Sequence, residues 1–305
     1  MAAREMTNFT APQTPTGLAA LFDQYDAFVF DLWGVLHDGK QCYPGILPML
    51  RKVRAAGKKV GILSNSPRPL AAAAENIRKF NLVPEYYDAL LTSGQLVFEA
   101  LRERSDPWLQ KLGKDCIHIG PDHEFASFAP LGLTKEGEVE DATFLFVTGV
   151  DDALATRDDF QPILDYGLTR KLPMLCANPD RNVMVGDQRS ISAGALAAHY
   201  ASLGGDVRDT YGKPHPEIFR RMLQQLGSPP QRTLMIGDNL LTDIAGARAL
   251  QIPTLWIYGG VHLSDLGPEA ANDLAMAGTI AAEELTAYLQ QQNSGTDYVL
   301  PRVIL

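Results

Sequence analysis

The stretch at residues 28–36, FVFDLWGVL, decides the fold and raises the question of function. Residues 27–30 are apolar throughout, and Asp31 follows them directly. The same pattern recurs at residues 59–63, 233–236 and 254–258, which end in Ser64-Asn65, Gly237-Asp238-Asn239 and Gly259-Gly260. Short apolar runs of this kind predict buried strands of a parallel sheet. Functional groups gather at the carboxyl ends of such strands, so these polar clusters are expected to converge.

Helical patterns alternate with these strands, at residues 46–56, 71–80, 216–226 and 241–250. This alternation implies right-handed crossovers between parallel strands. The segment at about 98–203 has strands of its own, at 116–119 and 143–147, and its length is that of an ordinary domain. We therefore predict an α/β fold, with a Rossmann-like core of residues 1–97 and 204–305 and an inserted α/β domain of residues 98–203.

The composition excludes several classes of protein. The chain has 305 residues, of which 46% are hydrophobic, and this is enough for a substantial core. Its net charge of -9, with scattered Lys and Arg residues, argues against nucleic-acid binding. Three widely spaced cysteines indicate neither a disulfide framework nor a zinc site. No targeting segment is recognisable and no apolar run approaches the roughly 20 residues of a membrane span, so we expect a cytoplasmic protein.

The polar residues at the predicted strand ends suit phosphoryl transfer. A carboxylate such as Asp31 can attack phosphorus, but a divalent cation must first screen the repulsion between the two anions. Asp31 and Asp238 offer the hard oxygen ligands that Mg²⁺ prefers. Ser64 can donate a hydrogen bond to a phosphoryl oxygen, and Lys213 can neutralise charge on the transferring group. The sequence thus predicts a magnesium-dependent site for a small phosphorylated substrate.

Four motifs in order, FDLWGV, LSNS, GKPHP and GDNLLTDI, resemble those of the haloacid dehalogenase superfamily. The stretches ANPD (177–180) and SAGALAA (192–198) are similar to the cap domain of its class IIA branch, which contains p-nitrophenyl phosphatases and pyridoxal phosphate phosphatase. The resemblance implies a core with an inserted cap, Mg²⁺ as cofactor and hydrolysis of a small phosphorylated metabolite through an aspartyl-phosphate. It also implies a homodimer that pairs through the cap.

The resemblance assigns roles to individual residues. Asp31 would be the nucleophile, and Ser64, Lys213 and Asp238 would complete the catalytic set. The metal site would consist of Asp31, the backbone carbonyl of Trp33, Asp238 and Asp243, with Asn239 helping to position the metal or its waters. Expected contacts to the substrate come from Ser64, Asn65, Lys213, His37, Asn178 and Asp180.

Trp33 departs from the family pattern. Phosphatases of this superfamily normally have a second aspartate there, which protonates the leaving group and then activates water. An indole N–H does not titrate usefully, and loss of a positioned acid–base group typically lowers the rate about 10²- to 10⁴-fold. The chain could hydrolyse only activated phosphates, could recruit another group such as His37 or Asp38, or could bind phosphorylated ligands with little turnover. A hydrolase of a bond other than a phosphate ester is a further alternative, and a weak or specialised phosphatase is the favoured interpretation.

Overall fold

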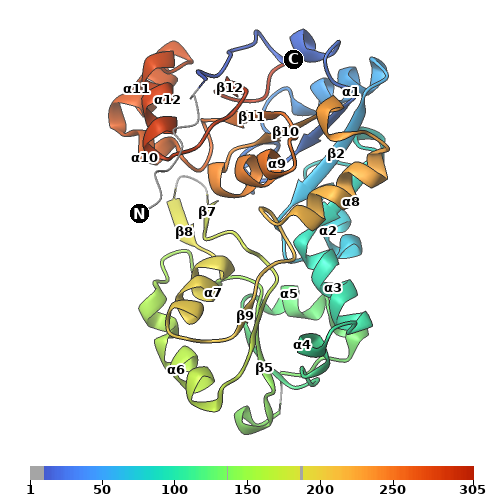
Figure 1. Cartoon of the computed structure of the whole chain (residues 1–305), viewed down its shortest axis with the longest axis vertical. Helices are drawn as coiled ribbons and strands as arrows, with labels where there is room; N and C mark the ends of the chain where they lie inside the picture. Colours follow the sequence, from blue (N-terminus) through green and yellow to red (C-terminus); the bar gives the residue numbers. More distant parts are fainter. Residues whose placement is uncertain (1–9, 136, 186–187) are drawn as a thin grey trace, which may run out of the picture.

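A computed structural model of the chain describes residues 10–135, 137–185 and 188–305, which form two lobes (Figure 1). The first lobe is built on a six-stranded sheet with the order β12-β11-β10-β1-β2-β3, in which every pair is parallel. Its strands are β1 (Ala27–Phe30), β2 (Lys59–Ser64), β3 (Ala89–Thr92), β10 (Thr233–Gly237), β11 (Thr254–Ile257) and β12 (Tyr298–Leu300). The chain adds β2 and β3 on one side of β1 and later adds β10, β11 and β12 on the other side. The order of the strands therefore reverses between β1 and β10, and a doubly wound sheet has a crevice at such a point.

Alternate residues of each strand face opposite sides of the sheet, because side chains of a strand have a period of two. Phe28 and Phe30 of β1 pack into one apolar cluster together with helices α1 (Ile46–Ala55) and α2 (Leu70–Arg78). Ala27 and Val29 pack into another with α8 (Pro216–Leu226) and α9 (Ala245–Ala249). Both faces of the sheet are therefore covered, which explains why the strands are continuously apolar.

The second lobe lies between β3 and β10 in the sequence and has its own parallel sheet, with the order β4-β5-β6-β9. Leu145 and Val147 of β5 (Phe144–Val147) face a cluster that includes α7 (Ala193–Ser202), whereas Phe144 and Phe146 face a cluster that includes α3 (Ser93–Glu103). The elements of this lobe are α3 (Ser93–Glu103), α4 (Pro107–Gln110), β4 (Cys116–Ile119), α5 (Asp122–Ala126), β5 (Phe144–Val147), α6 (Gln161–Arg170), β6 (Met174–Cys176), α7 (Ala193–Ser202) and β9 (Val207–Arg208).

An antiparallel pair, β7 (Asn182–Val185) with β8 (Gln188–Ile191), projects from the second lobe towards the first (Figure 1). Arg189 of β8 forms an ion pair of 2.6 Å with Asp265 of helix α10 (Leu263–Leu266) in the first lobe. Arg68, which follows β2, forms a second ion pair between the lobes, 3.1 Å from Glu124 of α5. The lobes are thus held together by polar contacts on both sides of the crevice.

The predicted α/β class is confirmed, and each of the predicted strands is present. The helix predicted at 241–250 differs at its start, where a π-helix (Leu240–Ile244) precedes α9. The Asn239 side chain accepts a hydrogen bond from the Leu241 backbone, and the Asp243 carboxylate accepts one from the Asn239 backbone. A π-turn of this kind is frequent at functional sites, and here it contains Asp243.

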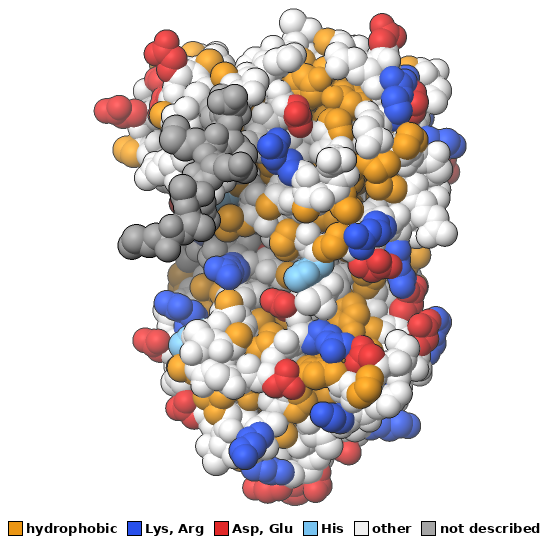
Figure 2. Space-filling model, viewed as in Figure 1, with side chains coloured by type: hydrophobic (Ala, Val, Ile, Leu, Met, Phe, Trp, Pro, Cys, Tyr) orange, Lys and Arg blue, Asp and Glu red, His pale blue; other side chains and the backbone are white. Residues whose placement is uncertain are grey.

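The remaining elements are short or lie at the edge of the first lobe. Helices α11 (Pro268–Ala277) and α12 (Ala282–Gln291) contribute to a separate apolar cluster with Trp256 of β11. Short 3₁₀ turns occur at Leu18–Leu21, Pro84–Tyr86, Ala129–Leu131, Val139–Asp141, Arg157–Phe160 and Pro230–Arg232. Among the described residues, no helix has the length and apolarity to cross a membrane. Acidic and basic side chains are interspersed on the face seen in Figure 2, without a continuous basic patch there.

Candidate active site

Two aspartates lie side by side because their strands are neighbours in register. Asp31 directly follows β1 and Asp238 directly follows β10, and Phe30 is paired with Ile236 in the parallel ladder. The Asp31 backbone N–H donates to the Ile236 carbonyl at 2.9 Å, which fixes the end of β1 against β10. The expected convergence of polar residues at the carboxyl edge of the sheet is therefore what the backbone pairing produces.

Lys213 joins this pair from the loop before α8. Its ammonium Nζ lies 2.5 Å from Asp31 Oδ1 and 2.6 Å from Asp243 Oδ1, and it also donates to the Leu63 carbonyl at 3.1 Å. Lys213 is only 1% exposed. All three donor protons of the ammonium thus have acceptors in a buried site, as a charge in the interior requires.

Burial and mutual repulsion set the protonation of this cluster. Burial raises the pKa of Asp31 to about 7, even though the charge of Lys213 acts in the opposite direction. Burial and the charge of Asp31 raise the pKa of Asp238 well above its usual range. Burial alone would lower the pKa of Lys213, but the carboxylates of Asp243 and Asp31 raise it above its usual value. The raised pKa values mean that these carboxyl groups retain protons near neutral pH, and a divalent cation binding here would displace those protons.

The carboxylates of Asp31, Asp238 and Asp243 fit a divalent cation. One oxygen from each lies within 4.8 Å of the others. A Cβ atom on Gly34 would lie 2.1 Å from Asp238 Oδ2, and one on Gly260 would lie 2.3 Å from the same atom, so two glycines leave the space that this carboxylate occupies. The Val261 backbone N–H donates to Asp238 Oδ2 at 2.8 Å and orients it. Several hard oxygen donors with room for water suit Mg²⁺.

Asn65 connects the first lobe with the second. Its carboxamide oxygen accepts from the Lys213 backbone N–H at 2.7 Å, and its Nδ2 donates to the Lys213 carbonyl at 2.9 Å. Nδ2 also donates to Asp180 Oδ1 of the second lobe at 2.9 Å. Burial raises the pKa of Asp180 to about 6. One amide therefore fixes both the lysine loop and a carboxyl group of the opposite lobe.

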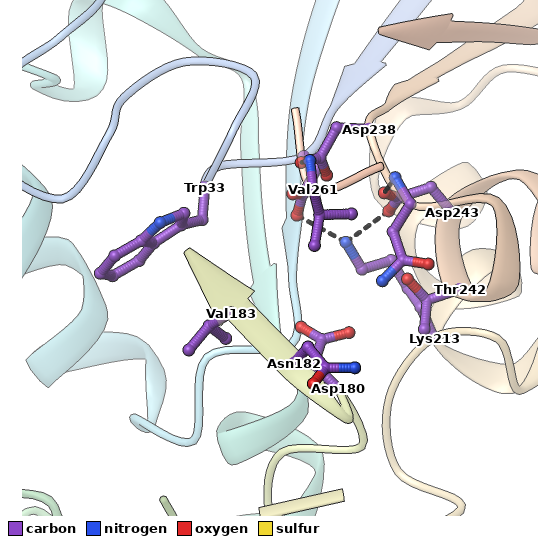
Figure 3. A pocket seen from close by; sticks show the side chains of 11 residues that line it. Trp33, Asp180, Asn182, Val183, Lys213, Asp238, Thr242, Asp243 and Val261 are labelled. Atoms are coloured by element: carbon purple, nitrogen blue, oxygen red, sulfur yellow. Dashed lines mark hydrogen bonds and ion pairs between the residues drawn. The ribbon is translucent and has the colours of Figure 1, made fainter. Parts of the chain in front are cut away.

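The aspartates and Lys213 open into a cavity of about 30 Å³ between the lobes (Figure 3). The Trp33 side chain is 38% exposed and points away from the carboxylates. A Cβ on Gly39 would lie 2.5 Å from the indole, so the ring packs against the backbone of its own loop. The described lining consists of Asp31, Trp33, Asp180, Asn182, Val183, Lys213, Asp238, Asn239, Thr242, Asp243 and Val261.

Four predicted substrate contacts lie outside this described lining: Ser64, Asn65, His37 and Asn178. His37 is 3% exposed, stacks on Phe80 with ring centroids 4.2 Å apart, and accepts a hydrogen bond from the Gly39 backbone at Nδ1. Burial lowers the pKa of His37 to about 4. Ser64 accepts from the Ser66 backbone, and Asn178 donates to Ser192. Asp38, considered as a replacement base, accepts from the backbones of Lys40 and Gln41 in a tight turn. In this structure these side chains stabilise loops.

Sequence reasoning missed several residues of the cavity. Val261 orients Asp238 through its backbone, and the sequence signal for it was the Gly259-Gly260 pair at a strand end. Asn182 and Val183 follow the ANPD stretch and reach the cavity through β7. Thr242 was not predicted to line the cavity, because the helical pattern gives no sign of the π-turn that contains it. Backbone donors and residues brought in by lobe packing carry little sequence signal.

Comparison with known proteins places this geometry among hydrolases. A family model described as haloacid dehalogenase-like hydrolase matches residues 25–251. The chain is 28% identical over 280 residues to glycerol-3-phosphate phosphatase of Rattus norvegicus, covering 83% of this chain and 85% of that protein.

Solved structures give the same result for the fold. A haloacid dehalogenase-like hydrolase from Brucella suis 1330 superimposes with a TM-score of 0.76 and is 30% identical, covering 95% of this chain and 100% of the other. A p-nitrophenyl phosphatase from Archaeoglobus fulgidus superimposes with a TM-score of 0.64 at 22% identity, covering 92% of this chain and 97% of the other, and it shares the fold.

Proposed function

We propose, from the premise that this chain belongs to the haloacid dehalogenase-like hydrolase family, that it hydrolyses the phosphate ester of a small metabolite with Asp31 as nucleophile. The family predicted from the four motifs is confirmed. The observation that carries the proposal is the buried ammonium of Lys213 between Asp31 and Asp243, 2.5 and 2.6 Å away. A nucleophilic carboxylate must be held against an anionic substrate, and a fixed cation beside it lowers that repulsion.

The proposed reaction has two steps, and each residue has a role in one or both of them. Asp31 would form a bond to phosphorus while the ester P–O bond breaks, which leaves an aspartyl-phosphate and a leaving oxygen that takes up a proton. Water would then attack the same phosphorus, the bond to Asp31 would break, and inorganic phosphate would depart. Lys213 would balance the charge of the phosphoryl group in both steps, and Asn65 would hold the lysine loop in place.

The Asp31 and Asp238 carboxylates, the Trp33 carbonyl and Asp243 would hold Mg²⁺. When bound there, Mg²⁺ would neutralise the charge between the nucleophile and the phosphate. The likeness to glycerol-3-phosphate phosphatase supports a small alcohol phosphate as the substrate of this chain. The cavity of about 30 Å³ has room for only a few water molecules, so the second lobe would act as a cap that opens to admit such an ester.

Phosphate release from small phosphate monoesters and from p-nitrophenyl phosphate tests this function. Release is expected with Mg²⁺ and is expected to stop with EDTA or in the Asp31→Asn variant, which is nearly isosteric. Release that persists in Asp31→Asn would exclude an aspartyl-phosphate. If the folded parent released no phosphate, Trp33 would become the explanation and the chain would be a phospho-metabolite binding protein or a hydrolase of another bond.

A further inference from the structure

The reaction needs a proton donor at a place that Trp33 does not supply. In an in-line displacement at phosphorus, the leaving oxygen lies opposite the attacking atom. Asp31 attacks from the wall of the first lobe, so the leaving oxygen of a bound ester faces the second lobe. An alkoxide leaves slowly without a proton, and a positioned acid at that wall would contribute about 10²- to 10⁴-fold.

The second lobe contributes Asp180, Asn182 and Val183 to the described lining of the cavity. Asp180 is the one titratable side chain among these three. It stands across the cavity from the carboxylates of the first lobe, and Figure 3 shows its carboxyl group turned towards them. A leaving group held between the lobes would therefore meet Asp180.

Asp180 is fixed by both lobes, its carboxyl group by the first and its backbone by the second. Asn65 of the first lobe donates to Asp180 Oδ1 at 2.9 Å. Within its own lobe, the Asp180 backbone N–H donates to Asn178 Oδ1 at 3.0 Å, and Asn178 donates to Ser192 Oγ at 3.1 Å. A Cβ on Gly194 would lie 2.1 Å from the Pro179 carbonyl, so α7 packs tightly against this loop. A side chain held this way has the preorganisation that an acid–base group needs.

We propose that Asp180 is the general acid and general base of this site, in the place of the aspartate that Trp33 replaces. The inference rests on the proposed phosphatase function. As the ester P–O bond breaks and its electron pair stays on the leaving oxygen, the Asp180 proton moves to that oxygen and completes the alcohol. Asp180 then takes a proton from the water that attacks the aspartyl-phosphate, which releases phosphate and returns Asp31 to its carboxylate form.

The electrostatics of the closed site agree with this role. Burial raises the pKa of Asp180 to about 6, with the charge of Lys213 acting against the rise and that of Asp243 adding to it. The other charged groups that face the cavity are Asp31 and Asp238. An acid–base group with a pKa near neutral can give and take a proton at the same pH. Asp180 therefore has the protonation behaviour that an alternating acid and base requires.

The test compares two leaving groups in Asp180→Asn and in the parent. For an alkyl phosphate such as glycerol phosphate, kcat/KM is expected to fall about 100-fold or more, because the alkoxide needs the proton. For p-nitrophenyl phosphate, whose leaving group is stable as an anion, kcat/KM is expected to stay within about tenfold of the parent. Its turnover should instead show a burst of p-nitrophenolate followed by a slow phase, since loss of the base slows hydrolysis of the aspartyl-phosphate.

Two outcomes would overturn the role of Asp180 and leave the phosphatase intact. One is an equal loss on both substrates, which would make Asp180 a binding residue. The other is unchanged turnover of the alkyl phosphate while Asp31→Asn abolishes it. Asp158→Asn, in the second lobe outside the described lining of the cavity, is the matched control and should change neither rate. Absence of phosphate release by the parent would overturn the phosphatase function and this role together.

Trp33→Asp provides a second test that does not depend on Asp180→Asn folding well. If Asp180 supplies the proton, a carboxyl at position 33 should raise kcat/KM for the alkyl phosphate by less than about tenfold, because the parent already has its acid. An increase of about 100-fold would mean that the parent has no working acid, and the proposed role would be wrong.

Discussion

Replacing Lys213 by methionine removes the cation of the buried cluster and keeps most of its apolar volume. The ammonium is 1% exposed and pairs with Asp31 and Asp243 at 2.5 and 2.6 Å. Removing one partner of a buried ion pair typically destabilises a protein by about 3–5 kcal/mol, because the other charge stays buried and unpaired. The Leu63 carbonyl also loses a donor at 3.1 Å.

A carboxyl group of the variant can take up a proton, which limits the destabilisation and makes it depend on pH. Without the ammonium, a carboxyl group of the folded variant has a pKa above its unfolded value of about 3.9 and binds a proton that the unfolded chain does not. Protonating one carboxylate has a free-energy cost of about 4 kcal/mol at pH 7 but only about 1.5 kcal/mol at pH 5. The free energy of unfolding of Lys213→Met should therefore be lower than that of the parent by about 3–4 kcal/mol at pH 7 and by about 1.5 kcal/mol at pH 5.

Urea unfolding in EDTA at the two pH values measures the difference, and EDTA keeps cations away from the anionic cluster. Trp256 is fully buried and donates to the Asp238 carbonyl at 2.9 Å, so it contributes, together with Trp33 and Trp108, to a fluorescence change on unfolding. Arg232→Met removes an ion pair with Asp26 at the surface and is the matched control, because exposed ion pairs contribute little to stability at either pH value. A Lys213→Met loss below about 1 kcal/mol at pH 7, or one that does not shrink at pH 5, would refute the charge argument.

Three further predictions concern a glycine, an ion pair between the lobes and the oligomeric state. Gly34→Ala and Gly45→Ala both place Cβ at positive φ, but only the former meets Asp238, so in the phosphate-release assay Gly34→Ala should lose activity and Gly45→Ala should keep it. Burial raises the pKa of Glu124 to about 7 from 4.5, although the charge of Arg68 acts in the opposite direction. The parent therefore loses stability as the pH rises from 4.5 to 7, because Glu124 becomes ionised in a buried position. Glu124→Gln should be more stable than the parent at pH 8 by up to about 3 kcal/mol. Near pH 4.5, urea unfolding should show no difference between the two proteins. The second lobe exposes Leu154 and Val139, and light scattering should give twice the chain mass of 33.3 kDa, whereas a monomer mass would contradict cap pairing.

The sequence predicted the parts of the site that depend on single strands. Asp31 and Asp238 each follow an apolar run, and parallel pairing of those runs is enough to bring the two carboxylates together. Lys213 and Asp243 were predicted from motif order, and the structure places both in the same buried cluster. Local chemistry and the parallel sheet rule account for this part of the prediction, because neither requires knowledge of how the lobes pack.

The parts that were not predictable depend on contacts between distant segments. The Asn65–Asp180 bond joins residues 115 positions apart and exists because the two lobes are in contact. The Trp33 ring packs against Gly39, and the sequence motif does not reveal this contact or the direction of the side chain. His37 was predicted to contact the substrate, yet it is buried and stacks on Phe80. Tertiary packing decided each of these side-chain positions, whereas residue type decided the chemistry that they can perform.

Closure of the lobes and assembly of the acid–base site are the same event if Asp180 is the proton donor. Asn65 makes two bonds to the Lys213 backbone within the first lobe and a third to Asp180 across the crevice. Opening would break only the third, so the nucleophile and its cation would stay assembled while the acid withdrew. In relatives with an aspartate at the position of Trp33, the acid would stay with the nucleophile in either state. The exchange of that aspartate for tryptophan would therefore confine alkyl phosphate hydrolysis to the closed state and leave the open state able to bind substrate without cleaving it.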